Sequence, residues 1–264
     1  MKKSLHNERV IITGASSGIG KEMAIEVAAR GGEPVLLARS VDKLEHLSRH
    51  IYENTGVKAP YYKLDVTSST AIKSTFNHIF KEAAKPTTLI NNAGFAIFDY
   101  AENATEKDIE DMFRVNVFGT IACTQAAIPY MKENNYGQVI FIASLAGKMA
   151  TPKASVYSAT KHAVLGFANA LRMEMKETPV HVSVVNPGPV RTNFFQTADS
   201  TGDYEKNVEK MMLEPDYVSS KIVKLVVKPK REINLPGWMG TGAKLYQLFP
   251  GVVEKLAGKR LNRK

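Results

Sequence analysis

The sequence predicts an α/β protein with one doubly wound parallel sheet of about seven strands flanked by helices. Three observations support this prediction. Short β-branched runs alternate with amphipathic stretches along most of the 264 residues. A glycine-rich turn joins the first run to the first helical stretch. Small or polar residues follow several of the runs, at the strand ends where parallel sheets bind ligands.

The first unit is a strand, a glycine-rich turn and a helix. Residues 9–13 form a β-branched run typical of a buried parallel strand, and residues 21–30 have helical spacing. Glycines in the turn allow the backbone to approach a pyrophosphate, and the helix start offers free N–H groups and a positive dipole end. The sequence therefore predicts a dinucleotide site in this turn, formed by Gly14, Ser16, Ser17, Gly18, Ile19 and Gly20.

The second strand, predicted over 34–38, bears on the choice of dinucleotide. NAD sites usually place an acidic residue about 20 positions after the glycines, where it binds the ribose 2′-hydroxyl. Here that place holds Ala38, followed by Arg39 and Ser40. Because the planar fork of an arginine matches phosphate oxygens, Arg39 favours NADP(H). The alternative is a surface arginine without this role.

The alternation of strands and helices continues to residue 235. Further strands are predicted over 58–65, 88–94, 137–143, 180–185 and 232–235. Helices are predicted over 41–54, 69–84, 106–131, 155–176 and 222–227. Since parallel strands end at a common edge, the polar groups after them should meet there: residues 13–20, Arg39, Asp65, 91–94 and Ser144.

The helix predicted over 155–176 carries a candidate acid/base pair. Tyr157 and Lys161 are four residues apart and share a helix face. An ammonium group near a phenol lowers the phenol pKa from about 10, which suits proton transfer near neutral pH. Taken alone, the same pair also fits a solvated lysine beside a half-buried tyrosine.

These motifs occur in the order found in short-chain dehydrogenases/reductases, and the chain resembles the NADP-preferring type of that family. The resemblance covers roughly residues 8–195 and is carried by 13–20, Asp65, 91–94, Asn116, Ser144, Tyr157, Lys161 and 187–192. It implies a Rossmann-type domain, which we assign to residues 1–240. It also implies hydride transfer between NADP(H) and a carbonyl or alcohol.

The resemblance implies a role for each matching residue. Tyr157 would exchange a proton with the substrate oxygen, and Ser144 would hydrogen-bond that oxygen. Lys161 would bind the nicotinamide ribose and lower the pKa of Tyr157, while Asn116 would hold a water in a proton relay to Lys161. The cofactor would also contact Asp65, Val66, Asn92, Ala93, Gly94, Pro187, Gly188, Val190 and Thr192. No metal is implied.

Residues 193–220 correspond to a segment that closes over the substrate in the family. The segment is unusually apolar, with Phe194, Phe195, Tyr204, Met211, Met212 and Leu213. These residues favour an apolar or elongated substrate, although packing on the domain would explain them as well.

Residues 241–264 are predicted to form a basic extension of two short helices that separate at Pro250. The net charge of +9 equals that of residues 221–264, where eleven Lys or Arg residues face two acidic ones. One helical face collects Leu245, Leu248, Phe249, Val252, Val253 and Leu256. Such a face fits an oligomer contact or a weak peripheral contact with a membrane. We expect no nucleic-acid partner.

Composition places the chain among globular proteins, with 44% hydrophobic and 23% charged residues. The single cysteine, Cys123, excludes an internal disulfide and fits a reducing compartment. Residues 1–9 lack the apolar run of a signal peptide, and no stretch of about 18 apolar residues could cross a membrane. We therefore expect a cytoplasmic protein.

Two functions fit these observations. The first is an NADP-dependent enzyme acting on a carbonyl or alcohol, and the second is a cofactor-binding regulatory protein of the same fold without turnover. The complete set of Asn116, Ser144, Tyr157 and Lys161 favours the enzyme. The helices predicted over 106–131 and 155–176 are apolar on more than one side, which predicts a homodimer or homotetramer.

Overall fold

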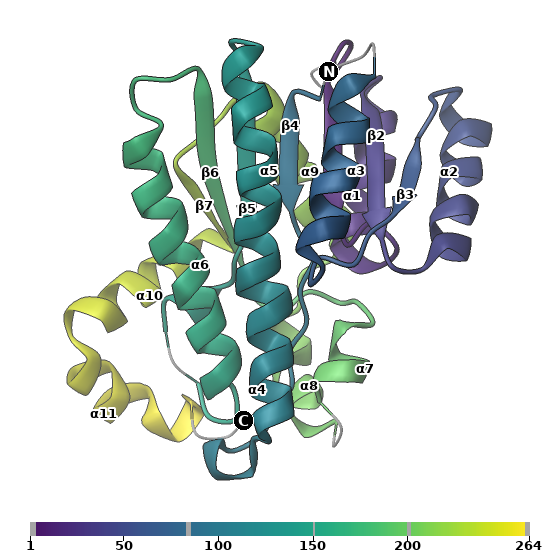
Figure 1. Cartoon of the computed structure of the whole chain (residues 1–264). Helices are drawn as coiled ribbons and strands as arrows, with labels where there is room; N and C mark the ends of the chain where they lie inside the picture. Colours follow the sequence, from purple (N-terminus) through teal and green to yellow (C-terminus); the bar gives the residue numbers. More distant parts are fainter. Residues whose placement is uncertain (1–3, 83–85, 150, 200–201, 262–264) are drawn as a thin grey trace.

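A seven-stranded parallel sheet forms the centre of the computed structural model, which describes residues 4–82, 86–149, 151–199 and 202–261 (Figure 1). The strand order is β3-β2-β1-β4-β5-β6-β7, and all neighbouring strands are parallel. The strands are β1 (Arg9–Thr13), β2 (Glu33–Ala38), β3 (Tyr61–Lys63), β4 (Thr88–Asn91), β5 (Gly137–Ile142), β6 (Val180–Pro187) and β7 (Glu232–Leu235). The predicted fold class is confirmed.

Helices cover both faces of the sheet. Successive residues of a strand point to opposite faces, so Val10 and Ile12 of β1 join one core cluster and Ile11 joins the other. The first cluster is covered by α1 (Gly18–Ala28), α2 (Val41–Thr55) and α9 (Pro215–Val227). The second is covered by α3 (Ser69–Lys81), α5 (Thr120–Glu133) and α6 (Ser155–Glu174). Both faces are therefore buried, which explains the continuous apolar runs of the strands.

The long helix predicted over 106–131 contains a π-helical segment. It divides into α4 (Glu106–Phe113), the π segment η2 (Arg114–Gly119) and α5, with helical backbone at each junction. A π turn adds one residue to a helical turn and therefore shifts the direction of the side chains that follow it. Asn116 lies in this segment and is buried.

Several boundaries differ from the predictions. The edge strand β3 spans Tyr61–Lys63 rather than 58–65, because it pairs with β2 over three residues only. Helix α9 begins at Pro215 rather than residue 222, with the proline in the first turn where its missing N–H costs nothing. Helix α3 ends at Lys81, and residues 83–84 of its predicted span lie outside the described ranges.

Short helices occupy the carboxyl end of the sheet. They include η1 (Ala101–Asn103), η3 (Leu145–Gly147), α7 (Phe194–Ala198), α8 (Asp203–Val208) and η4 (Glu209–Met211). Val190 and Leu213 form an isolated parallel bridge, so the chain leaving β6 is held to the residues that precede α9. The segment predicted to cover the substrate therefore returns to the edge of the sheet where the strands end.

The carboxyl-terminal extension consists of α10 (Gly237–Leu248) and α11 (Pro250–Leu261). It begins earlier than the predicted residue 241, and its two helices meet next to Pro250 as expected. Figure 1 shows the pair, in yellow, reaching away from the sheet beyond the end of β7. No helix within the described ranges has both the length and the apolar character needed to cross a membrane.

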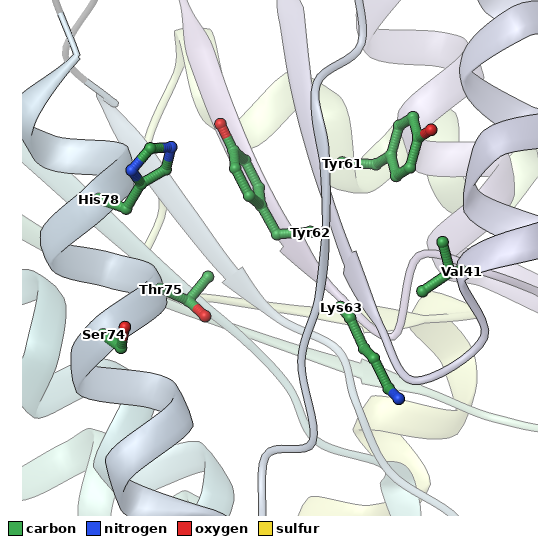
Figure 2. Close-up of a pocket in the computed structure, with 7 residues that line it drawn as sticks. All are labelled: Val41, Tyr61, Tyr62, Lys63, Ser74, Thr75 and His78. Atoms are coloured by element: carbon green, nitrogen blue, oxygen red, sulfur yellow. The ribbon is translucent and has the colours of Figure 1, made fainter.

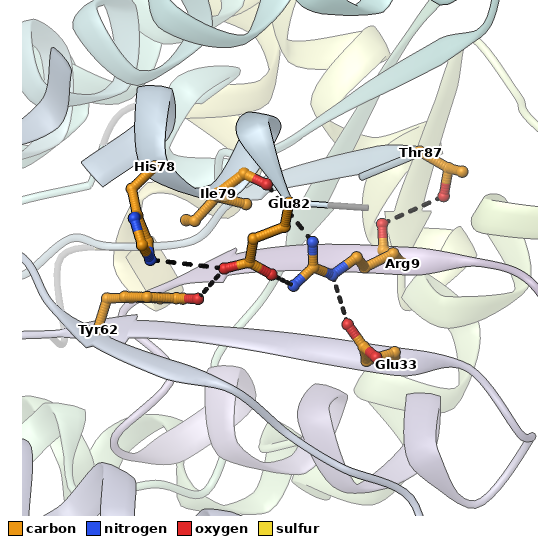
Figure 3. A network of polar contacts seen from close by, with 7 residues as sticks. All are labelled: Arg9, Glu33, Tyr62, His78, Ile79, Glu82 and Thr87. Atoms are coloured by element: carbon orange, nitrogen blue, oxygen red, sulfur yellow. Dashed lines mark hydrogen bonds and ion pairs between the residues drawn. The ribbon is translucent and has the colours of Figure 1, made fainter. Parts of the chain in front are cut away.

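A polar network closes the opposite, amino end of the sheet (Figure 3). The buried guanidinium of Arg9 donates to Glu33 and to Glu82, and the Tyr62 hydroxyl also donates to Glu82. Burial opposes ionisation of Glu82, but the hydrogen bonds from Tyr62 and Arg9 prevail and lower its pKa. The network thereby joins β1, β2 and β3 to the end of α3.

We predict that Arg9→Met lowers the free energy of unfolding by about 2 kcal/mol at neutral pH, because it leaves two carboxylates without their cation. This is less than for a fully buried pair, since both carboxylates are about a third exposed. The lowered pKa of Glu82 makes its contribution complete above the ordinary value of 4.5 and lost as the pH falls through the folded-state value.

Urea denaturation across this pH range measures the effect, with Arg49→Met as the matched control. Arg49 pairs with Glu45 on an exposed face of α2, so its loss should cost little. A difference between Arg9→Met and the original chain that stays constant down to about pH 3 would contradict the assignment.

Candidate active site

The turn after β1 is packed against the turn after β4. The Thr13 hydroxyl accepts hydrogen bonds from the backbone N–H groups of Asn92 and Ala93, each at 3.0 Å. Gly14 has φ +66°, and a Cβ atom there would lie 2.9 Å from Ala93 Cα. A Cβ at Gly20 would lie 2.3 Å from the Gly14 carbonyl oxygen. Glycine is thus required at both positions, and the turn holds the start of α1 at the ligand edge of the sheet.

The start of α1 has the features of an anion site. Ser17 is its N-cap residue but makes no side-chain capping hydrogen bond. The first-turn N–H groups are therefore not satisfied by Ser17 and lie beside the glycine backbone. Gly18 has φ +53°, and a Cβ added to it would lie 3.6 Å from Thr192 Cβ. Gly18 and Thr192, both predicted to bind the cofactor, therefore lie side by side although they are far apart in the sequence.

Arg39 and Asp65 lie at a second corner of the same edge, after β2 and β3. The backbone N–H and the hydroxyl of Thr67 donate to Asp65 Oδ1 at 2.9 and 2.8 Å. The pKa of Asp65 is lowered chiefly by the Thr67 backbone hydrogen bond, with a smaller contribution from the charge of Arg39. Arg39 is exposed and makes no hydrogen bond or close ion pair with the described residues. The N–H donors of its guanidinium are therefore available to a ligand.

Asn116 links the loop after β4 to α6. Its Oδ1 accepts from the Phe95 N–H at 3.0 Å, and its Nδ2 donates to the Phe95 carbonyl and to Thr160 Oγ1 at 2.8 and 3.1 Å. A Cβ added to Gly94 would lie 3.0 Å from Asn116 Oδ1 and 3.6 Å from Lys161 Nζ. Both amide protons of Asn116 are used, so this side chain could bind a relay water only through Oδ1.

Ser144, just after the end of β5, interacts with the Tyr157 phenol. Ser144 Oγ also accepts from the Ala146 N–H at 3.1 Å and lies 3.4 Å from the Pro187 carbonyl, which fixes its position. Burial is the main influence on the Tyr157 phenol and raises its pKa, while the hydrogen bond from Ser144 lowers the pKa to a smaller extent. The predicted lowering of the Tyr157 pKa is therefore wrong for this structure.

Lys161 lies beside Tyr157 as the helical spacing predicted. Its Nζ is 5.6 Å from the centre of the Tyr157 ring and donates to the Ile142 carbonyl at 3.1 Å. Burial lowers the pKa of Lys161 to about 8, so the ammonium form still predominates at neutral pH. The cation is present, but burial, and not the charge of Lys161, dominates the pKa of Tyr157.

An aromatic cluster surrounds the Tyr157 ring, and sequence reasoning missed one of its members. Phe98 lies 5.8 Å from Tyr157 and 4.3 Å from Tyr204, measured between ring centres. Phe194 lies 6.0 Å from Tyr157, and Phe195 lies 5.7 Å from Phe194. The Phe98 N–H donates to the Ala198 carbonyl at 2.7 Å and so joins the loop after β4 to α7. The apolar run at residues 95–98 was the available signal.

The other apolar residues of 193–220 have different surroundings. Met212 packs beside Phe195, Tyr204 and Val208, whereas Leu213 pairs with Val190 and Met211 is exposed. Packing on the domain therefore accounts for Met212 and Leu213, whereas Phe194 of this segment contacts the Tyr157 ring.

A cavity of about 530 Å³ lies elsewhere, along the outer edge of β3 (Figure 2). Its lining consists of Val41, Tyr61, Tyr62, Lys63, Ser74, Thr75 and His78. None of the predicted catalytic residues contributes to it, so it is separate from the Ser144–Tyr157 pair. In the described part of the chain, no three His, Cys, Asp or Glu side chains group closely enough to hold a metal ion.

Known proteins share both the sequence and the fold of this chain. The short chain dehydrogenase family profile matches residues 8–203. Dehydrogenase/reductase SDR family member 7B of Rattus norvegicus is 32% identical over 253 residues, covering 92% of this chain and 77% of that protein. The uncharacterized oxidoreductase YxnA of Bacillus subtilis is 30% identical over 261 residues, covering 97% and 73%.

Solved structures extend the comparison. The closed form of a serine dehydrogenase complexed with NADP+ has a TM-score of 0.78 at 28% identity, covering 86% of this chain and 93% of that one. An actinorhodin polyketide ketoreductase with NADPH has a TM-score of 0.80 at 26% identity, covering 88% and 97%. Together with the family profile, these similarities show that the chain belongs to the short-chain dehydrogenase/reductase family of oxidoreductases.

Proposed function

We propose that this chain transfers a hydride between NADP(H) and an apolar carbonyl or alcohol substrate, with Tyr157 as the proton donor or acceptor. The observation that carries the proposal is the buried Tyr157 phenol, next to Ser144 and beside the ammonium of Lys161. Tyr157 would provide a proton to the substrate oxygen, Ser144 a second hydrogen bond to it and Lys161 a positive charge, all within an apolar environment. Such an arrangement suits a reaction in which negative charge develops on an oxygen.

Two features support NADP(H) as the cofactor. The glycine turn and the uncapped start of α1 fit a pyrophosphate, because a Cβ atom would fill the space at Gly14 and Gly20. The exposed guanidinium of Arg39 fits a 2′-phosphate. Several similar structures were solved with NADP+ or NADPH, which agrees with this choice. The nicotinamide would supply or accept the hydride.

The residues of the chain would handle the proton. Burial keeps Tyr157 protonated at neutral pH, so the phenol is ready to donate to the oxygen of a carbonyl. Ser144, whose Oγ accepts from the Ala146 N–H, would turn its single hydroxyl proton from the Pro187 carbonyl to the same oxygen as a second hydrogen bond. Lys161 would stabilise the phenolate left after proton transfer, since its ammonium lies on the same helix face. A protonated phenol is the form that carbonyl reduction requires.

The aromatic cluster supports an apolar substrate. Phe98 and Phe194 contact Tyr157 directly, and Phe195 and Tyr204 pack behind them. A carbonyl that reaches the Tyr157 hydroxyl would lie against these rings, which favour apolar groups and exclude water.

We also propose a homo-oligomer formed through the helical face that carries η2 and α6. Ile109 of α4, Phe118 of η2 and Met173 of α6 are exposed, although all three are large and apolar. Such residues favour burial against a second copy of the chain.

We predict that Tyr157→Phe lowers the turnover number for carbonyl reduction by about 100- to 10,000-fold while NADPH binding is retained. The phenylalanine keeps the ring contacts with Phe98 and Phe194 but removes the proton. NADPH oxidation with a panel of apolar ketones and aldehydes measures turnover, and fluorescence titration measures cofactor binding. Tyr52→Phe, on the exposed side of α2, is the matched control.

Residual turnover near that of the original chain would contradict the role of Tyr157. If the original chain binds NADPH but reduces no member of the panel, the regulatory function without turnover becomes the better explanation.

Arg39→Ala should weaken NADPH binding by about tenfold to a hundredfold and leave NADH binding nearly unchanged. The reason is the loss of a charged hydrogen bond, which contributes about 1.5–3 kcal/mol. Dissociation constants for both cofactors decide the point, with Arg49→Ala as a control on the exposed part of α2. An unchanged ratio of the two constants in Arg39→Ala would rule out the 2′-phosphate contact.

Sedimentation equilibrium should give a mass of two or four times 29.1 kDa. Replacing Phe118 and Met173 together with lysine should shift the mass toward that of the monomer, because two copies would then bring like charges together. The same change at Tyr52 should have no such effect. A monomeric mass for the original chain would be incompatible with the proposed interface.

A further inference from the structure

We propose that α10 and α11 form an interfacial contact that holds this chain on an anionic membrane surface. The proposal rests on three independent observations: an outward apolar face, a basic charge balance around it and the position of both helices at the end of the sheet that bears the site.

The outward face of α10 is apolar. Trp238, Leu245 and Leu248 are 65%, 51% and 71% exposed. At about 100° per residue these three positions fall within one side of the helix, opposite the buried Gly240 and Ala243. Phe249 and Val252 continue the exposed apolar surface into the start of α11, at 58% and 57% exposure. Five large apolar side chains so exposed on two consecutive helices form an apolar patch that favours burial against a partner.

The opposite face of α10 is fixed to the domain. A Cβ atom on Gly240 would lie 2.5 Å from Asn234 Cβ, so the helix is in close contact with β7. A Cβ on Gly188 would lie 3.1 Å from Met239 Sδ. The Tyr246 hydroxyl donates to Glu254 Oε1 at 3.0 Å and ties α10 to α11. The apolar patch therefore cannot turn inward without breaking these contacts.

The basic residues around this patch favour an anionic partner. Residues 237–264 contain six Lys or Arg residues against one acidic residue, Glu254, which is bound to Tyr246. Lys244 and Lys255 are exposed on the two helices. A second copy of the same surface would bring equal charges together, whereas an anionic lipid surface attracts them.

The tertiary structure also divides the basic excess that the sequence places in 221–264. Lys228, Lys230 and Arg231 precede β7 and therefore lie at the amino end of the sheet, away from α10. They cannot act together with the apolar patch on a flat surface. The charge relevant to membrane contact is the net +5 of residues 237–264.

The position of the patch relates it to the proposed reaction. Helix α10 follows the carboxyl end of β7 and packs on Gly188, next to the Pro187 carbonyl that lies close to Ser144. A membrane on this side would bring a lipid-dissolved carbonyl compound to the end of the sheet that carries Tyr157. This last step depends on the proposed function, whereas membrane binding itself does not.

Trp238 is the only tryptophan of the chain and reports directly on the patch. Its emission should shift to shorter wavelength when the full chain is mixed with vesicles of equal parts phosphatidylcholine and phosphatidylserine. Lipids brominated on their acyl chains should quench it, because an interfacial helix buries its apolar face about 5–10 Å deep. Co-sedimentation with the same vesicles gives the affinity, and pure phosphatidylcholine vesicles should bind more weakly.

Two sets of variants separate the apolar and the charge contributions. Replacing Leu245, Leu248 and Phe249 together with glutamine should abolish the emission shift and the co-sedimentation. Tyr52→Gln, a change of a similarly exposed large side chain on α2, should leave both unchanged. Lys244→Gln and Lys255→Gln should each weaken binding to the anionic vesicles by about fivefold, as expected for one basic residue near an anionic surface. Thermal unfolding checks that each variant is folded.

The absence of an emission shift and of co-sedimentation at low salt would overturn the proposal. An emission shift that depends on protein concentration without lipid would do the same, since it would assign the patch to a contact between copies. Neither outcome bears on the reaction, because NADPH oxidation with a water-soluble ketone is measured without vesicles.

Discussion

The close approach of two backbone turns is the constraint on which the site depends. The turns after β1 and β4 touch where Gly14 meets Ala93, and the Thr13 hydroxyl binds two N–H groups of the second turn. This contact places the start of α1 and the loop from Asn92 to Phe98 at one edge of the sheet. A side chain at Gly14 would separate the two turns, and the proposed cofactor and substrate sites would no longer be adjacent.

Burial then decides the charge states within the site. The phenol of Tyr157 and the ammonium of Lys161 lie on one helix face, yet desolvation moves their pKa values in opposite directions. Each shift favours the neutral form of its group, as expected where water is excluded. Tyr157 therefore holds its proton, while Lys161, with a pKa of about 8, remains largely charged at neutral pH. In the proposed reaction, Tyr157 would give a proton and Lys161 would stabilise the anion that remains.

The aromatic rings that exclude water come from two distant segments. Phe98 follows β4, whereas Phe194, Phe195 and Tyr204 follow β6, and a backbone hydrogen bond from Phe98 to Ala198 holds the segments together. The same cluster buries Tyr157 and defines what can approach its hydroxyl. Both the pKa of Tyr157 and the preference for an apolar substrate would therefore depend on the contacts of this aromatic cluster. Helix α10, which follows β7, lies at the same end of the sheet as this aromatic cluster.

The amino-acid sequence by itself determined the order of strands and helices, the glycine turn and the Tyr157–Lys161 pairing, because periodicity and spacing are local properties of the chain. Boundaries such as the short edge strand β3 and the π segment around Asn116 depend on pairing and packing partners that no local pattern encodes. The pKa of Tyr157 was predicted in the wrong direction for the same reason. The i, i+4 spacing reveals Lys161, but burial comes from the loop after β4 and from α7, far away in sequence. The tertiary structure alone decided that Phe98 joins the site, that Met211 does not, and that the basic residues of 221–264 divide between opposite ends of the sheet.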